Sequence, residues 1–216
     1  MTDRELREHV ENALDWEPSI DAAEIGVSVD GGVVTLRGDV RSYSEKATAE
    51  RVALGVYGAK AVANDITVRL REGQLHSDTE IAQAVVSALK WNTTVPDEKI
   101  AVAVGDGWVK LSGKVDWEYQ RTAATNAVRD LEGVRGVTNL ISVEPHASVT
   151  DVKSKIESAL KRSAEVDARR INVTVTDGKV VLSGNVHSWF ERNEARQAAW
   201  AAPGVKEVDD RLAIVP

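Results

Sequence analysis

The chain has 216 residues, no cysteine and a formal net charge of −7. Without cysteine, neither disulfides nor thiolate-bound metal can stabilise it, and the acidic balance argues against a general nucleic-acid-binding protein, which would carry a basic surface. No apolar run reaches the roughly 18 residues of a transmembrane helix, and no signal peptide follows Met1. As given, the sequence predicts a cytoplasmic protein, and a periplasmic one only if a signal was removed.

One pattern of residues occurs three times. Each copy has an isoleucine that opens an alternating apolar segment, followed thirteen residues later by a glycine; these pairs are Ile25 and Gly38, Ile100 and Gly113, and Ile171 and Gly184. An internal repeat determines the architecture before any other feature. It predicts three small domains at residues 1–70, 76–145 and 148–216, here called repeats 1, 2 and 3. Each has about 70 residues, near the lower limit for an independent hydrophobic core.

Repeat 1 gives the order of its elements. Thr2 and Glu5 form a capping box at the start of a helix, and two alternating apolar segments, 25–29 and 33–40, predict strands. Glycines in the Asp30-Gly31-Gly32 sequence predict the tight turn between these strands. An alanine-rich second helix follows Ser42, Gly58 is expected to end it, and residues 62–68 predict a third strand.

Repeats 2 and 3 follow the same order, although Trp117 replaces the serine cap of the second helix in repeat 2. Strands with one apolar face are typical of a sheet that helices cover on one side only. The sequence therefore predicts an α+β protein in which each repeat is a three-stranded mixed sheet covered on one face by two helices, in the order αββαβ.

The hairpin segments VVTLRGDV (33–40), WVKLSGKV (108–115) and VVLSGNV (180–186) resemble the BON domain family. The resemblance covers nearly the whole chain and identifies it as three tandem BON domains of the osmotically inducible and nodulation type. It implies a bacterial binding module with roles in osmotic and envelope stress, often proposed to attach to phospholipid or to envelope proteins. One member with a single BON domain is described as a potassium binder.

Residues for catalysis are not apparent. The four histidines occupy different positions in the repeats, and we find no metalloprotease, nucleophile-elbow or phosphate-loop motif; the histidines are His9, His76, His146 and His187. The acidic pair Asp209-Asp210 lacks the ligand spacing of a calcium loop. The sequence thus favours a binding protein over an enzyme, with no cofactor and no metal site.

Aromatic residues lie outside the aliphatic core positions. Trp16 and Trp91 stand at equivalent places at the end of the first helix, where we expect them to cap the open end of a small core or to fill contacts between repeats. Trp108 occupies an outward strand position beside Lys110 and should lie on the uncovered face of its sheet.

Repeat 3 carries the candidate binding site. The net charge is −5 over residues 1–72, −3 over 73–146 and +1 over 147–216. Helical geometry places Trp189 and Trp200 on one stripe that should face away from the sheet, flanked by arginines. Tryptophan beside arginine suits a membrane interface or a protein contact. The predicted site is Trp189, Phe190, Arg192, Arg196 and Trp200, together with Lys161 and Arg162.

Three functions follow as hypotheses. The leading one is a non-enzymatic stress protein whose third repeat attaches to anionic phospholipid or to an envelope-associated partner. The alternative is a scaffold or chaperone-like protein that binds proteins or itself through open sheet faces, with small residues such as Ala101, Ala103 and Ser112 exposed there. Potassium or small-ligand sensing rests on the family resemblance alone.

Overall fold

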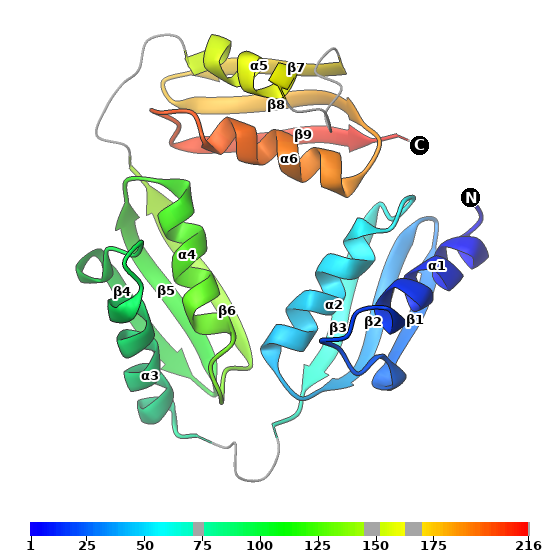
Figure 1. Cartoon of the computed structure of the whole chain (residues 1–216), viewed down its shortest axis with the longest axis vertical. Coiled ribbons are helices and arrows are strands. Elements are labelled where there is room, and N and C mark those ends of the chain that lie inside the picture. The colour runs from blue at the N-terminus through cyan, green and yellow to red at the C-terminus, as the bar shows by residue number, and fades with distance from the viewer. Residues whose placement is uncertain (71–75, 145–151, 163–169, 216) are drawn as a thin grey trace. The chain divides into compact units, whose positions relative to one another are not determined.

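A computed structural model describes residues 1–70, 76–144, 152–162 and 170–215 (Figure 1). Repeat 1 contains α1 (Asp3–Asp15), a short 3-10 helix (Ala22–Glu24), β1 (Ile25–Asp30), β2 (Val33–Val40), α2 (Tyr43–Gly55) and β3 (Ala61–Val68). Repeat 2 contains α3 (Asp78–Trp91), a 3-10 helix (Asp97–Lys99), β4 (Ile100–Gly105), β5 (Trp108–Val115), α4 (Glu118–Arg129) and β6 (Gly136–Val143). Repeat 3 contains α5 (Val152–Arg162), β7 (Ile171–Thr176), β8 (Lys179–Val186), α6 (Trp189–Trp200) and β9 (Glu207–Ile214).

Each repeat has its own three-stranded sheet, with the second strand in the centre. In repeat 1, β2 pairs antiparallel with β1, where Ile25 stands opposite Gly38, and parallel with β3, where Val33 stands opposite Ala61. Repeat 3 has the same pairing. Figure 1 shows both helices of each repeat against one face of its sheet. The α+β fold and its mixed sheets are therefore confirmed.

The core of each repeat lies between the sheet and its two helices. In repeat 1, Leu6, Val10 and Leu14 of α1 share one buried cluster with Val34 and Leu36 of the central strand, and α2 adds the fully buried Ala49 and Ala53. Alanine at these positions lets α2 lie close to the sheet. Within the described ranges, no helix has both the length and the apolar composition needed to cross a bilayer.

The predicted capping boxes are present. The Thr2 backbone N–H donates to the Glu5 carboxylate at 2.7 Å, and the corresponding bond from Ser77 to Glu80 is 2.8 Å. These hydrogen bonds hold the pKa of both glutamates below the ordinary value. Ser42 and Ser188 cap α2 and α6 by accepting from the N–H three residues ahead.

The hairpin turns also have the predicted glycine-dependent conformation. Both central residues of each turn have positive φ, at +58° and +85° for Gly31 and Gly32 and at +52° and +77° for Asp106 and Gly107. Two positive φ values in succession are typical of the type I′ turn, whose twist matches that of the strands it joins.

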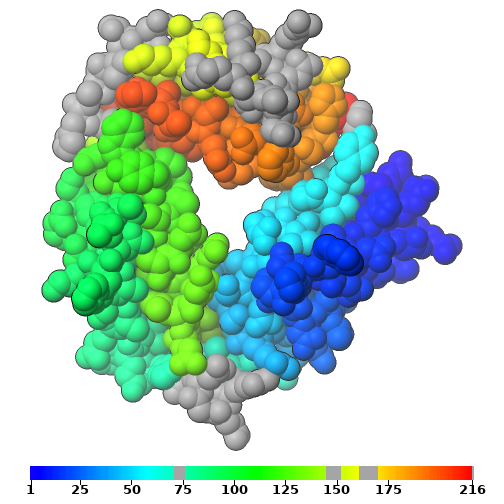
Figure 2. All heavy atoms as spheres, viewed as in Figure 1, coloured from blue at the N-terminus to red at the C-terminus, as the bar shows by residue number. Residues whose placement is uncertain are grey.

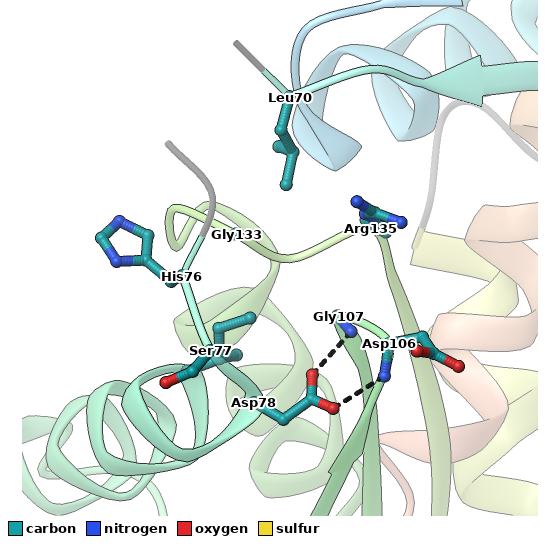
Figure 3. A pocket seen from close by; sticks show the side chains of 9 residues that line it. Leu70, His76, Ser77, Asp78, Asp106, Gly107, Gly133 and Arg135 are labelled. Atoms are coloured by element: carbon teal, nitrogen blue, oxygen red, sulfur yellow. Dashed lines mark hydrogen bonds between the residues drawn. The ribbon is translucent and has the colours of Figure 1, made fainter. Parts of the chain in front are cut away.

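An aspartate at the start of the first helix holds this turn in place. The Asp3 carboxylate accepts hydrogen bonds from the backbone N–H groups of Gly31 and Gly32, at 2.8 and 3.0 Å. In repeat 2, Asp78 accepts from Asp106 and Gly107, both at 2.9 Å (Figure 3). This contact leaves no signal in the sequence pattern, because the carboxylate and the turn lie 28 residues apart.

The glycine of the repeated hairpin segment is required by a close backbone contact. Gly38, Gly113 and Gly184 have φ values of +137°, +142° and +120°. A Cβ at any of them would collide with the carbonyl oxygen of the residue before the first strand, which is Glu24, Lys99 and Arg170 respectively. The repeated glycine thus lets the start of the first strand approach the central strand.

The prediction that Gly58 and its equivalents in repeats 2 and 3 end the second helices is wrong. Gly58, Gly133 and Gly204 do adopt positive φ, at +92°, +84° and +90°. The second helices, however, end three to four residues earlier, at Gly55, Arg129 and Trp200. These glycines instead shape the turn into the last strand.

Candidate functional site

The predicted site of repeat 3 lies mainly on α6, whose atoms are orange in the space-filling view (Figure 2). Arg192 Nε donates to Asp210 Oδ2 at 2.8 Å, and the two side chains are 23% and 14% exposed. The same guanidinium lies 4.7 Å from the centre of the Trp189 ring. Arg192 therefore ties α6 to β9 and is largely engaged inside its own repeat.

The five α6 residues do not form one outward stripe. Trp200 packs against the core of repeat 3 beside the buried Ala199, because an indole at the last helical position buries apolar area there. Phe190 is 54% exposed, and Arg196 is exposed and donates to Asn193 at 3.0 Å. The part of the site at the surface is therefore Phe190 and Arg196.

The other two residues of the predicted site lie on a different helix. Lys161 and Arg162 form the end of α5, and their side chains lie outside the described residues.

A buried glutamate and a histidine meet at the start of α6. Glu191 is 5% exposed; its Oε2 lies 3.1 Å from His187 Nδ1 and accepts from the His187 backbone N–H at 2.7 Å. On the other side of the ring, Nε2 lies 2.7 Å from Arg170 Nη1. Since a guanidinium only donates, Nε2 accepts and the imidazole proton lies on Nδ1. Arg170 thus occupies the nitrogen that a general base would offer to a substrate.

Two tryptophans are almost entirely in solvent. Trp16 is 89% exposed and Trp91 is 85% exposed. The prediction that they cap the open end of the core is therefore wrong for both. Asp15 and Glu17 flank Trp16, whereas Lys90 precedes Trp91. Because Arg51 pairs with Glu17 at 3.3 Å, the two equivalent indoles differ mainly in that Asp15 precedes Trp16 and Lys90 precedes Trp91.

The outer surface of α3 differs from that of α1. Beyond its acidic first turn, α3 exposes Gln83, Val86 and Lys90 in addition to Trp91, and Val86 is 53% exposed. The outer surface of α1 carries two ion pairs, Arg4 with Glu8 and Arg7 with Glu11. Of these two surfaces, the surface of α3 is better suited to contact an apolar or anionic partner.

A hollow opens beside the start of α3 in repeat 2 (Figure 3). It is lined by Leu70, His76, Ser77, Asp78, Ile81, Asp106, Gly107, Gly133 and Arg135. The Asp78 carboxylate in its wall already accepts two backbone N–H groups, and His76 Nε2 lies 3.4 Å from Glu132. No group of three or more His, Asp or Glu side chains suited to a metal ion occurs among the described residues.

The outer sheet faces of repeats 1 and 3 carry ion pairs. Arg37 pairs with Asp65 across β2 and β3 at 3.5 Å. In repeat 3, Lys179 pairs with Glu207, and Arg211 contacts Asp209 at 2.7 Å, which holds the pKa of Asp209 below its ordinary value. On repeat 2, Trp108 is 52% exposed at an outward strand position, as predicted.

Comparison with known proteins agrees with this architecture. The sequence profile of the BON domain matches residues 2–69, 77–145 and 148–216. Osmotically-inducible protein Y of Escherichia coli (strain K12) is 33% identical over 143 residues, which cover 64% of this chain and 71% of that protein. The outer membrane lipoprotein DolP of Haemophilus influenzae is 30% identical over 161 residues, covering 71% of this chain and 83% of the relative.

A third similar protein is the 21 kDa hemolysin of Actinobacillus pleuropneumoniae, 29% identical over 145 residues, which cover 66% of this chain and 74% of the hemolysin. The matched segments, the shared hairpin glycine and the αββαβ order of every repeat agree. The chain belongs to the BON domain family and consists of three tandem copies of that domain.

Proposed function

We propose that the chain is a non-enzymatic binding protein that attaches to an anionic phospholipid surface, with repeat 3 as the attaching domain. The observation that carries this proposal is the exposure of Phe190 and of Arg196 on α6, in the repeat that alone has a positive net charge. Similarity to an osmotically inducible protein and to an outer membrane lipoprotein supports a role at the cell envelope.

The two exposed side chains supply complementary contributions. An aromatic ring at a membrane interface buries apolar area among the headgroups. An arginine on the same helix contributes about 1 kcal/mol at an anionic surface, and salt weakens that attraction. Binding should therefore require anionic lipid and fall as the salt concentration rises.

Repeat 2 offers a second surface for the same function. On α3, Trp91 is nearly fully exposed and stands beside Lys90, with Val86 also in solvent. Trp16 is exposed to the same degree just after α1, but it lacks a preceding lysine: Asp15 and Glu17 flank it, and Arg51 pairs with Glu17 at 3.3 Å. Trp16 is therefore the matched control for Trp91.

The test is co-sedimentation of the full chain with phosphatidylglycerol-containing and with purely phosphatidylcholine vesicles, at low and high salt. Phe190→Ala/Arg196→Glu should abolish most binding to the anionic vesicles, Trp91→Ala should reduce it, and Trp16→Ala should leave it unchanged. Unfolding curves check that each variant remains folded.

Two results would overturn the role of repeat 3. If Trp91→Ala abolishes binding while Phe190→Ala/Arg196→Glu does not, attachment belongs to α3. If no variant and no lipid composition matters, while the chain assembles with rising concentration in high salt, the scaffold alternative replaces lipid binding, because apolar contacts are little screened.

A further inference from the structure

Each repeat has an Asp-Gly step at its hairpin turn, and the sequence contains no others; the three are Asp30-Gly31, Asp106-Gly107 and Asp177-Gly178. A glycine has no side chain to shield its backbone nitrogen, so this nitrogen can attack the side-chain carboxyl group of a preceding aspartate. In repeats 2 and 3 the two residues are the central pair of the turn, with φ values of +52° and +77° in repeat 2 and +50° and +84° in repeat 3. The two turns therefore have the same backbone conformation.

The surroundings of these two turns also match. The Gly107 carbonyl accepts from the backbone N–H of Arg135 at 2.9 Å, and the Gly178 carbonyl accepts from that of Lys206 at 2.8 Å. The stem of the same basic side chain lies beside the glycine in each turn, and the aspartate is exposed in both. A difference in reactivity between the two turns must therefore come from another contact.

The two turns differ in the carboxylate that holds the glycine nitrogen. In repeat 2 the Gly107 N–H donates to Asp78 Oδ1 at 2.9 Å. Counted from the buried residues Ile81 and Val152 of the first helices, the position of Asp78 corresponds in repeat 3 to Val149, which lies outside the described residues. A valine side chain cannot accept a hydrogen bond. Among the described residues, no side chain accepts from the Gly178 N–H.

We propose that Asp177 is a site of isoaspartate formation, and that Asp78 suppresses the same reaction at Asp106. The backbone nitrogen of Gly178 loses its proton and attacks Asp177 Cγ. A bond forms between this nitrogen and Cγ, and the carboxyl group loses its hydroxyl as water, which gives a five-membered succinimide. Water then adds to the backbone carbonyl carbon of the ring and breaks its bond to nitrogen. The main chain now runs through the side-chain carbonyl, and one water molecule has been lost and one regained.

The hydrogen bond to Asp78 slows this reaction at Gly107 in two ways. The nitrogen must leave its acceptor before it can lose its proton and move towards Cγ of Asp106. The negative charge of the Asp78 carboxylate also disfavours the amide anion that attacks. Since a hydrogen bond to a charged group must first be broken, the reaction at Asp106 should be at least about tenfold slower than at Asp177.

The product implies an enzyme partner of defined chemistry. Isoaspartate leaves the former backbone carboxylate of residue 177 free and lengthens the main chain by one methylene group, which a two-residue turn with fixed φ values does not accommodate. A methyltransferase that recognises isoaspartate transfers a methyl group from S-adenosylmethionine to this carboxylate. Loss of methanol from the ester then restores the succinimide, which hydrolyses in part to aspartate. This inference does not depend on the proposed lipid attachment.

The test is incubation of the folded full chain at neutral pH, followed by digestion with trypsin, which releases the two turns as residues 100–110 and 171–179. Labelling with an isoaspartyl methyltransferase and mass spectrometry measure the isoaspartate in each peptide. In wild type, isoaspartate should accumulate at least about tenfold faster in 171–179 than in 100–110.

Two variants separate the contact from general destabilisation. Asp78→Val installs the residue that repeat 3 has at this position. It should raise the rate in 100–110 to that in 171–179 and leave the rate in 171–179 unchanged. Glu80→Gln weakens the capping box of α3 and keeps the Asp78 carboxylate, so its rate in 100–110 should stay slow.

Three results would overturn the proposal. Equal rates in the two peptides of folded wild type would exclude protection of Asp106. An unchanged rate in 100–110 of Asp78→Val would show that Asp78 does not control the reaction. Incubation in denaturant gives the reference, because the hydrogen bond is then absent and the two peptides should react equally fast. If 171–179 keeps the same lead there, the neighbouring residues determine the rates instead of Asp78.

Discussion

Arg192 and Asp210 join α6 to β9 in repeat 3 through a hydrogen bond of 2.8 Å between Nε and Oδ2. Repeat 1 makes the same connection with different residues. There Asn64 Nδ2 donates to the carbonyl of Lys46 at 3.1 Å, and Lys46 Nζ donates to the carbonyl of Ile66 at 2.7 Å. Both repeats thus link the second helix to the last strand. Repeat 1 does so through hydrogen bonds of Asn64 and Lys46 to backbone carbonyls, and repeat 3 through an ion pair.

This equivalence predicts a rescue. Arg192→Ala should destabilise repeat 3 by about 1–3 kcal/mol, because the mostly buried Asp210 carboxylate loses its charged partner and keeps only the Leu212 backbone N–H as a donor. Arg192→Lys/Asp210→Asn copies repeat 1 and should recover most of that loss. Chemical denaturation of the single and double variants measures the coupling. A double variant as unstable as Arg192→Ala would show that the two connections are not interchangeable.

The hairpin glycine of repeat 2 should tolerate no side chain. Gly113→Ala should cost at least about 2 kcal/mol, because its φ is +142° and the added methyl group would collide with the Lys99 carbonyl. Gly105→Ala is the matched control in the same sheet, since a Cβ there meets no atom within 4 Å. Amide hydrogen exchange in β4 and β5 reports the local stability. Similar protection from hydrogen exchange in Gly113→Ala and Gly105→Ala would contradict this prediction.

The aspartate that holds the hairpin turn should contribute to stability. Asp78→Ala removes two charge-assisted hydrogen bonds to backbone N–H groups and should cost about 1–2 kcal/mol. Asp78→Asn keeps one acceptor oxygen and should lose less. Denaturant unfolding measures both variants. If neither Asp78→Ala nor Asp78→Asn lowers the free energy of unfolding, the contact has no role in stability.

The capping box of α3 predicts a pH dependence. Hydrogen bonds from the Ser77 backbone and side chain hold the pKa of Glu80 below its ordinary value of 4.5. A lowered pKa in the folded state means that the contribution of the carboxylate is full above pH 4.5 and is lost as the pH falls through the lower, folded value. Wild type should therefore exceed Glu80→Gln in stability at neutral pH, and the difference should shrink on acidification. If the free energies of unfolding of wild type and Glu80→Gln change in parallel with pH, the Glu80 carboxylate makes no such contribution.

Local patterns in the sequence predicted most of the fold. The capping residues Thr2 and Ser77, the glycines of the hairpin turns and the period-two strands act over a few residues, and each lies where the pattern places it. The contact from Asp3 to the Gly31 turn was not predicted, because it joins residues distant in sequence and leaves no periodic signal.

The candidate site was less predictable than the fold. Helical geometry gives the direction of a side chain but not what stands opposite it. Trp200 therefore packs on the core, although the pattern predicts it on an exposed stripe, and Arg192, predicted to flank that stripe, reaches Asp210. Conversely, Trp91 is 85% exposed because none of the described elements covers the end of α3, and no residue in the sequence encodes that directly.

The contact between Asp3 and the hairpin turn also bears on the order of folding. It joins α1 to the β1–β2 hairpin within the first forty residues or so of the repeat, before α2 and β3 are needed. Short-range contacts form early because little chain entropy is lost in closing them. During synthesis from the N-terminus, repeats 1 and 2 can therefore each assemble the first helix and the hairpin before the parallel strand is added.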